Sequence, residues 1–85
     1  MDVVYTRTAL KELQKLPADK INLIRAGMKD VAKNPFDRDT TISPLKGYPN
    51  GYRKRFGDWR VLYTVETTIQ ILEMFKIGHR KDVYR

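Results

Sequence analysis

Apolar residues recur at helical spacing in two neighbouring stretches of the first 34 residues. The first stripe consists of Ala9, Leu13 and Leu16. The second stripe consists of Ile21, Ile24, Met28 and Val31. Thr6 or Thr8 can cap the first helix and Pro17 ends it, while Asn34 and Pro35 stop the second. The pattern predicts a helical hairpin whose shared apolar face needs a sheet to cover it.

β-Branched and aromatic residues mark the strands. Residues 3–5 predict a short strand at a sheet edge, and residues 52–56 and 59–65 predict two strands joined by a Gly57-Asp58 turn. Residues 69–77 are mostly apolar at both odd and even positions, which is typical of a central strand covered on both faces. Between helices and strands, residues 34–51 predict a long connection that is either a surface crossover or a functional loop.

The order of these elements predicts an α+β fold. The chain is expected to form an N-terminal strand, a two-helix hairpin and a three-stranded antiparallel meander. The strands are expected to form one antiparallel sheet that packs on the helices. The chain of 85 residues has room for a single domain, which we expect to span residues 1–85.

Composition excludes several classes of chemistry. The chain has no Cys and one His, so disulfides, thiol catalysis and a dedicated metal site are not expected, and no cofactor is expected either. No stretch resembles a signal peptide or a membrane span, so we expect a cytoplasmic protein without a membrane partner. The net charge of +7 favours a polyanionic ligand or an acidic protein partner.

The excess positive charge belongs to the predicted sheet. Residues 46–85 hold nine basic and four acidic residues, whereas residues 1–45 hold eight and six. A Gly57-Asp58 turn sets Arg55 opposite Arg60 across the two strands. One face, which is apolar except for its lysine, carries Tyr52, Lys54, Phe56, Trp59, Val61 and Tyr63. The other face carries Arg53, Arg55 and Arg60.

Two interpretations of the arginine face remain open at this point. Directly opposed like charges destabilise a strand pair, so a fold selected for stability alone would avoid them. The three guanidinium groups therefore favour an anion site suited to phosphate, although solvated charge is the usual meaning of a polar face. Tyr48, Tyr52, Trp59 and Tyr84 are candidate rings for base stacking, or simply for packing.

Cleavage of RNA without a metal needs positive charge on the phosphate, a base for the 2′-hydroxyl and an acid for the leaving oxygen. Arginines meet the first need and transfer protons poorly, because their pKa lies above about 12. His79 and Tyr84 are the candidate proton carriers near the C-terminus. From the residues alone, the sequence supports a surface that binds RNA or phosphate.

Several motifs, in this order and spacing, resemble the RelE/ParE toxin superfamily and more narrowly its RelE branch. The matching segments are residues 5–16, Leu45-Lys46-Gly47, residues 51–63 and residues 78–84. The resemblance implies the toxin of a toxin–antitoxin pair. Its RelE-like members enter the ribosomal A site and cut mRNA there, without a metal, by attack of a 2′-hydroxyl on the adjacent phosphate.

The resemblance also implies roles for individual residues. The catalytic group is expected to be Arg55, Arg60, Arg80 and Tyr84. The RNA-binding group is expected to be Lys46, Arg53, Lys54, His79 and Lys81. The family pattern places a lysine as general base where this chain has Arg55, which is a poor base. The proton is then taken by another residue, or the ribosome supplies the geometry.

The implied partners are an acidic, RelB-like antitoxin, the ribosome and the mRNA in its A site. Two rival interpretations remain. A ParE-like toxin would share the fold and act on DNA gyrase, and a non-catalytic basic module would bind nucleic acid without cutting it.

Overall fold

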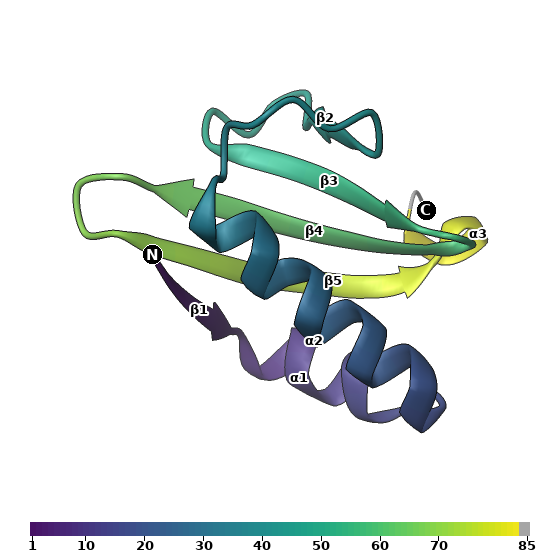
Figure 1. Ribbon diagram of the computed structural model, residues 1–85. Coiled ribbons are helices and arrows are strands. Elements are labelled where there is room, and N and C mark those ends of the chain that lie inside the picture. The colour runs from purple at the N-terminus through teal and green to yellow at the C-terminus, as the bar shows by residue number, and fades with distance from the viewer. Residues whose placement is uncertain (84–85) are drawn as a thin grey trace.

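A computed structural model describes residues 1–83 of the chain. The elements in chain order are β1 (Asp2–Tyr5), α1 (Arg7–Gln14), α2 (Ala18–Lys33), β2 (Ile42–Pro44), β3 (Gly51–Phe56), β4 (Trp59–Glu66), β5 (Ile71–His79) and α3 (Arg80–Val83). The two long helices cover one side of the sheet (Figure 1). The fold is therefore of the predicted α+β class.

The sheet has five strands in the order β1-β5-β4-β3-β2. Strands β3, β4 and β5 form the predicted antiparallel meander, and β1 lies at the predicted edge. Two expectations need correction. β1 pairs with β5 in parallel rather than antiparallel fashion, and the long connection contributes β2, which pairs with β3. β2 ends at Pro44, whose missing N–H is tolerated because this is an edge strand.

Local sequence explains how the two helices begin and pack. Thr6 caps α1, because its Oγ1 accepts a hydrogen bond of 3.1 Å from the Ala9 N–H. α2 begins directly after Pro17 without a side-chain cap. Gly27 in α2 faces the Phe56 ring, and a Cβ built there would lie 2.8 Å from Phe56 Cζ. The missing side chain therefore lets β3 approach α2 closely.

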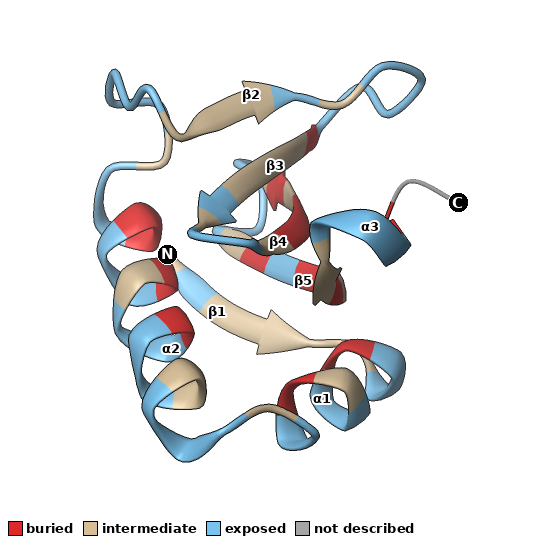
Figure 2. Ribbon diagram, turned by 90° about the vertical axis from the view of Figure 1, so that its right-hand side faces the viewer, coloured by how far each residue is buried: buried red, intermediate tan, exposed pale blue. Residues whose placement is uncertain are grey.

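The core lies between the helices and one face of the sheet. Its helical members are most of the predicted stripe residues together with one further alanine: Ala9, Leu13, Ile24, Met28, Val31 and Ala32. The remaining stripe residues, Leu16 and Ile21, are partly buried against this core. Its strand members come from β4 and β5: Val61, Tyr63, Val65, Leu72, Met74 and Ile77. The view in Figure 2 shows the buried segments of α2 turned toward the sheet, with α3 on the opposite side of the strands. We call the side opposite α1 and α2 the open face.

Strand β5 is central, as predicted, because it lies between β1 and β4. The expectation that both its faces are covered is only partly met. Leu72 and Met74 are buried under the helices, whereas Glu73 is exposed on the open face. The register with β4 also shifts between Leu62 and Tyr63, so β5 carries an extra residue, Phe75, at this point. No helix in residues 1–83 has the length and apolar character that a membrane span requires.

Replacing Tyr63 with phenylalanine is expected to raise the free energy of unfolding by about 1 kcal/mol. The Tyr63 side chain is fully buried, and its hydroxyl has no hydrogen-bond partner within the described residues. Burial also raises the pKa of Tyr63, so the unpartnered group stays protonated. Urea denaturation measures the change, with Tyr52→Phe as the control. A loss of more than about 0.5 kcal/mol would reveal a partner for the hydroxyl.

Candidate nucleic-acid interface

The β3–β4 hairpin brings the arginines together on the open face. Gly57 has φ +60°, which suits the first central position of a two-residue turn. This turn sets Phe56 opposite Trp59 and Arg55 opposite Arg60, as predicted. Arg53 lies two residues before Arg55 and therefore shares its face.

These arginines surround a polar hollow of about 360 Å³. We call it the arginine hollow, and it is lined by Thr40, Ser43, Arg53, Arg55 and Arg60. Ser43 belongs to β2, and Thr40 lies just before that strand. Sequence reasoning missed both hydroxyl residues because it left residues 34–51 as a connection. The β-branched run Thr40-Thr41-Ile42 was the available signal for a strand here.

Backbone and side-chain contacts fix the orientation of two of the three guanidinium groups. Arg53 Nη2 donates to Ser43 Oγ at 2.9 Å. Arg60 Nη1 donates to the carbonyl oxygens of Gly57 and Trp59 at 2.7 and 3.0 Å. Neither Arg55 nor Arg60 forms an ion pair with a carboxylate of residues 1–83. Within residues 1–83, Arg55 and Arg60 therefore offer the hollow positive charge without a carboxylate partner, together with N–H donors, which suit a phosphate.

Arg80 lies at the tip of the same hairpin. Its N–H donates to the Asp58 carbonyl at 2.7 Å, and its Nε lies 3.7 Å from Asp58 Oδ1. Both side chains are largely exposed, so this ion pair is weak and can exchange for a phosphate. Helix α3 turns back onto the open face, where Val83 lies against Gly78, the partner of Arg60 in the sheet. Arg80 thus approaches the arginine hollow without lining it.

The other residues of the predicted site lie around this end of the sheet or apart from it. The His79 ring packs edge-on against Trp59, its partner in the sheet, and therefore lies on the helix-covered face rather than with the arginines as expected. The His79 Nδ1 accepts a hydrogen bond of 3.2 Å from the Lys81 N–H. Lys81 is exposed on α3, and Lys46 is exposed on the turn after β2. Tyr84 lies outside the described residues.

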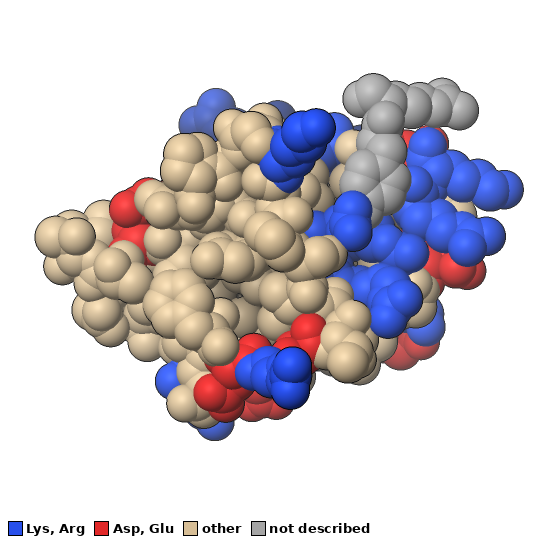
Figure 3. Space-filling model, turned by 90° about the horizontal axis from the view of Figure 1, so that it is seen from above, with Lys and Arg blue, Asp and Glu red and all other residues tan. Residues whose placement is uncertain are grey.

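The positive charge of the surface is concentrated at one end. In Figure 3 the Lys and Arg side chains gather on the right, where α3 and the β3–β4 turn lie in Figure 1. Acidic side chains lie at the left and along the lower edge, and a few border the blue cluster on the right (Figure 3). A field of one sign over a hollow surface attracts and steers an anionic ligand.

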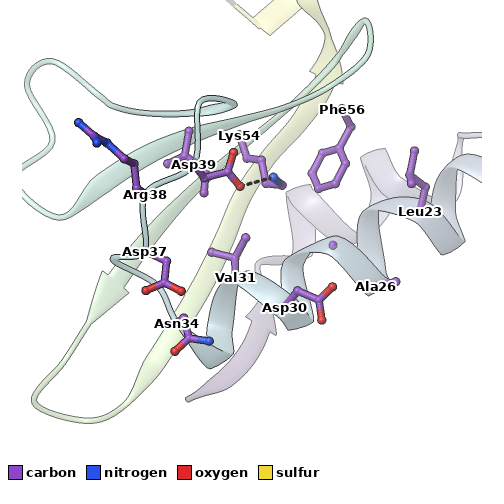
Figure 4. Close-up of a pocket in the computed structure, with 12 residues that line it drawn as sticks. Leu23, Ala26, Asp30, Val31, Asn34, Asp37, Arg38, Asp39, Lys54 and Phe56 are labelled. Carbon is purple, nitrogen blue, oxygen red and sulfur yellow. Dashed lines mark hydrogen bonds and ion pairs between the residues drawn. The ribbon is translucent and has the colours of Figure 1, made fainter.

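Lys54 is separated from the other predicted RNA-binding residues. Strand alternation turns it toward the helices, where it borders a cavity of about 540 Å³ between α2, β3 and the segment before β2 (Figure 4). Its Nζ lies 5.1 Å from the centre of the Phe56 ring and 3.1 Å from Asp39 Oδ2. Lys54 therefore ties the connection to β3, and its position is the one that the hairpin register predicted.

Asp39→Asn is expected to reduce the fall in the free energy of unfolding that accompanies acidification from about pH 4 to about pH 2. Asp39 accepts hydrogen bonds from the hydroxyl and N–H of Thr41 at 2.6 and 2.8 Å, and from Lys54. Led by the Thr41 hydroxyl, these bonds lower the pKa of Asp39 to about 2. A carboxylate whose pKa is lowered by folding stabilises the fold at any pH above its pKa in the unfolded chain. This stabilisation is lost as the pH falls and the carboxylate in the folded protein is protonated.

Urea denaturation at several pH values measures this effect, and Asp37→Asn is the control, because no hydrogen bond of the Asp37 carboxylate is seen within residues 1–83. Parallel pH profiles for the wild type and Asp39→Asn would contradict it. The interaction also matters for the site, because the Asp39–Thr41 turn positions Thr40 at the rim of the arginine hollow.

A family model described as the ParE toxin of the type II toxin–antitoxin system, parDE, matches residues 3–84. The chain belongs to this toxin family. The RelE1 protein of Methanocaldococcus jannaschii is 30% identical to this toxin over 85 residues, which are 99% of this chain and 94% of that protein. The match confirms the RelE/ParE resemblance seen in the sequence motifs.

Solved structures support the same fold. RelE in the archaeal RelE–RelB complex of Pyrococcus horikoshii OT3 gives a TM-score of 0.79 at 25% identity, over 95% of this chain and 96% of that one. The intact RelBE complex of E. coli gives a TM-score of 0.77 at 20% identity, over 91% and 93%. This toxin therefore has the RelE fold and is the toxin of a type II toxin–antitoxin system.

Proposed function

We propose that this toxin is an endoribonuclease that cuts mRNA in the ribosomal A site, in the cytoplasm, and so inhibits translation. The observation that carries the proposal is the arginine hollow, in which two guanidinium groups without carboxylate partners in residues 1–83 adjoin a third that is held by Ser43. A phosphodiester is the ligand that this charge and donor pattern suits best.

The reaction joins the 2′-oxygen of one nucleotide to the adjacent phosphorus and breaks the bond from phosphorus to the 5′-oxygen. The products are a 2′,3′-cyclic phosphate and a 5′-hydroxyl, which takes up the proton that balances the one lost by the 2′-hydroxyl. Arg60 and Arg55 stabilise the charge that develops on the phosphate oxygens, and Arg80 assists from the hairpin tip. We assign proton transfer to Tyr84, because a guanidinium group is a poor general base. His79 is the partner of Trp59 in the sheet and packs beside its ring on the helix-covered face, so it is not placed to act on a phosphate in the hollow.

Primer extension on ribosomes carrying a defined mRNA tests this function. The proposal predicts breaks within the A-site codon, and far fewer breaks when the same mRNA is offered without ribosomes. Tight, salt-dependent RNA binding without breaks would instead identify a non-catalytic binding module.

The name of the matching family model favours one further candidate, a toxin that acts on DNA gyrase like the ParE-type rival considered above. A DNA-cleavage assay with purified gyrase distinguishes the two. Gyrase-dependent DNA breaks together with intact mRNA would replace the ribonuclease proposal.

The partner that we propose for this toxin is an acidic, RelB-like antitoxin that covers the arginine hollow. The net charge of +7 favours an acidic partner, and relatives of the same fold were solved as complexes with RelB. Co-expression with the adjacent gene product is expected to abolish ribosome-stimulated cleavage, and raising the salt concentration is expected to restore it in part. Full cleavage by the complex at low salt would exclude occlusion.

A further inference from the structure

A partly exposed aromatic pair lies on the open face of the sheet. Tyr48, in the turn after β2, stacks on Phe75 of β5 with ring centroids 5.5 Å apart and an interplanar angle of 21°. Neither ring belongs to the core between the helices and the sheet. Tyr48 remains 53% exposed, so packing on Phe75 leaves much of its ring in contact with solvent.

The sheet register places this pair close to the arginine hollow. Arg53 on β3 is paired with Leu62 on β4, and Leu62 is paired with Lys76 on β5. Phe75 directly precedes Lys76. Neighbouring strands lie about 4.8 Å apart, so the backbone of Phe75 is about 10 Å from that of Arg53. A polynucleotide with one phosphate in the hollow can therefore bring a nearby base to the aromatic pair.

The backbone holds Tyr48 in place before any ligand binds. The Tyr48 N–H donates to the Leu45 carbonyl at 3.3 Å, and the Tyr48 carbonyl accepts from the Gly51 N–H at 2.9 Å. A Cβ at Gly51 would lie 2.5 Å from Tyr48 Cβ, so glycine permits this close approach. A ring held in this way loses little further conformational entropy when a ligand stacks on it.

We propose that Tyr48 is a stacking platform for a nucleobase of single-stranded RNA whose backbone occupies the arginine hollow. The inference rests on the proposed function for the identity of the ligand and adds a second, uncharged contact to it. Every base has a π-face, so such a platform binds single strands with little sequence preference. Phosphate at the arginines and a base at Tyr48 together define the path of the RNA across the open face.

Binding of two matched oligomers tests the platform without relying on cleavage. One is a hexamer of 2′-O-methyladenylate, which cannot be cut because the attacking hydroxyl is blocked. The other has the same phosphates with a stable abasic sugar at every position. Fluorescence anisotropy at fixed salt compares the wild type with Tyr48→Leu and Tyr48→Trp. Phe36→Leu is the matched control, because Phe36 is also exposed, at 62%, but packs edge-on against Tyr52.

Tyr48→Leu is expected to weaken binding of the base-containing hexamer by about 5- to 100-fold. Its affinity for the abasic hexamer should stay within about twofold of the wild-type affinity. Tyr48→Trp is expected to retain or strengthen the binding, and Phe36→Leu to change neither affinity. Equal losses for both hexamers, or none for either, would overturn the platform while leaving the ribonuclease proposal intact. If the wild type bound neither hexamer and made no A-site breaks, the proposed function itself would fail.

Discussion

Arg60→Ala is expected to slow A-site cleavage by about 100- to 1,000-fold, which is the usual cost of removing one preorganised donor from a developing anion. Arg60 Nη1 is held by two backbone carbonyls at the hairpin turn. The guanidinium is thus fixed before the substrate arrives, and no residue in 1–83 forms an ion pair with it that would compete with a phosphate oxygen. Single-turnover cleavage of a defined mRNA on purified ribosomes measures the effect.

Two companion variants separate this role from simple positive charge. Arg38→Ala removes an exposed arginine near the other cavity and is expected to leave the rate unchanged. Arg60→Lys keeps the charge but lacks the planar fork that binds carbonyls and phosphate together, so we expect only partial activity. The assigned role would be wrong if Arg60→Ala kept the rate within about threefold of the wild type at an unchanged melting temperature.

Local patterns were sufficient to predict most of the fold. The helical stripes in residues 9–31 identified the buried helix faces, and the Gly57-Asp58 turn identified the hairpin register. A two-residue turn fixes every cross-strand pair beyond it, so the grouping of Arg53, Arg55 and Arg60 on one face followed from the sequence alone. The same register turned Lys54 toward the helices, whereas the family resemblance assigned it to RNA.

Features set by distant contacts could not be predicted in this way. β2 has three residues and its strand pairing is with β3, so the short β-branched run before it is a weak signal when read from the sequence alone. The parallel pairing of β1 with β5 depends on the path of the whole chain. Consequently Thr40 and Ser43 were missed as walls of the arginine hollow. Helix α3 was not predicted either, because strand alternation gives no reason for the chain to turn onto the open face after β5.

Arg55→Glu is expected to move stability and activity in opposite directions. Arg55 and Arg60 are directly opposed across an antiparallel pair, where like charges are unfavourable and opposite charges are favourable. The substitution turns this repulsion into attraction, so the free energy of unfolding should rise by about 1 kcal/mol. Cleavage should fall by at least about 100-fold, because the new carboxylate neutralises Arg60 and repels the phosphate.

Urea denaturation and single-turnover cleavage on the same preparations measure the two effects. Lys29→Glu is the matched control, since it makes the same charge change at an exposed position on α2. Arg55→Gln removes the repulsion without adding attraction, so its stability should lie between those of the wild type and Arg55→Glu.

If Arg55→Glu lost stability, the two guanidinium groups would not repel each other in the free protein. If it gained stability and still cut mRNA at the wild-type rate, the hollow would not be where the phosphate reacts. A gain in stability with a loss of cleavage would mean that the opposed arginines are kept for the substrate at the expense of the fold.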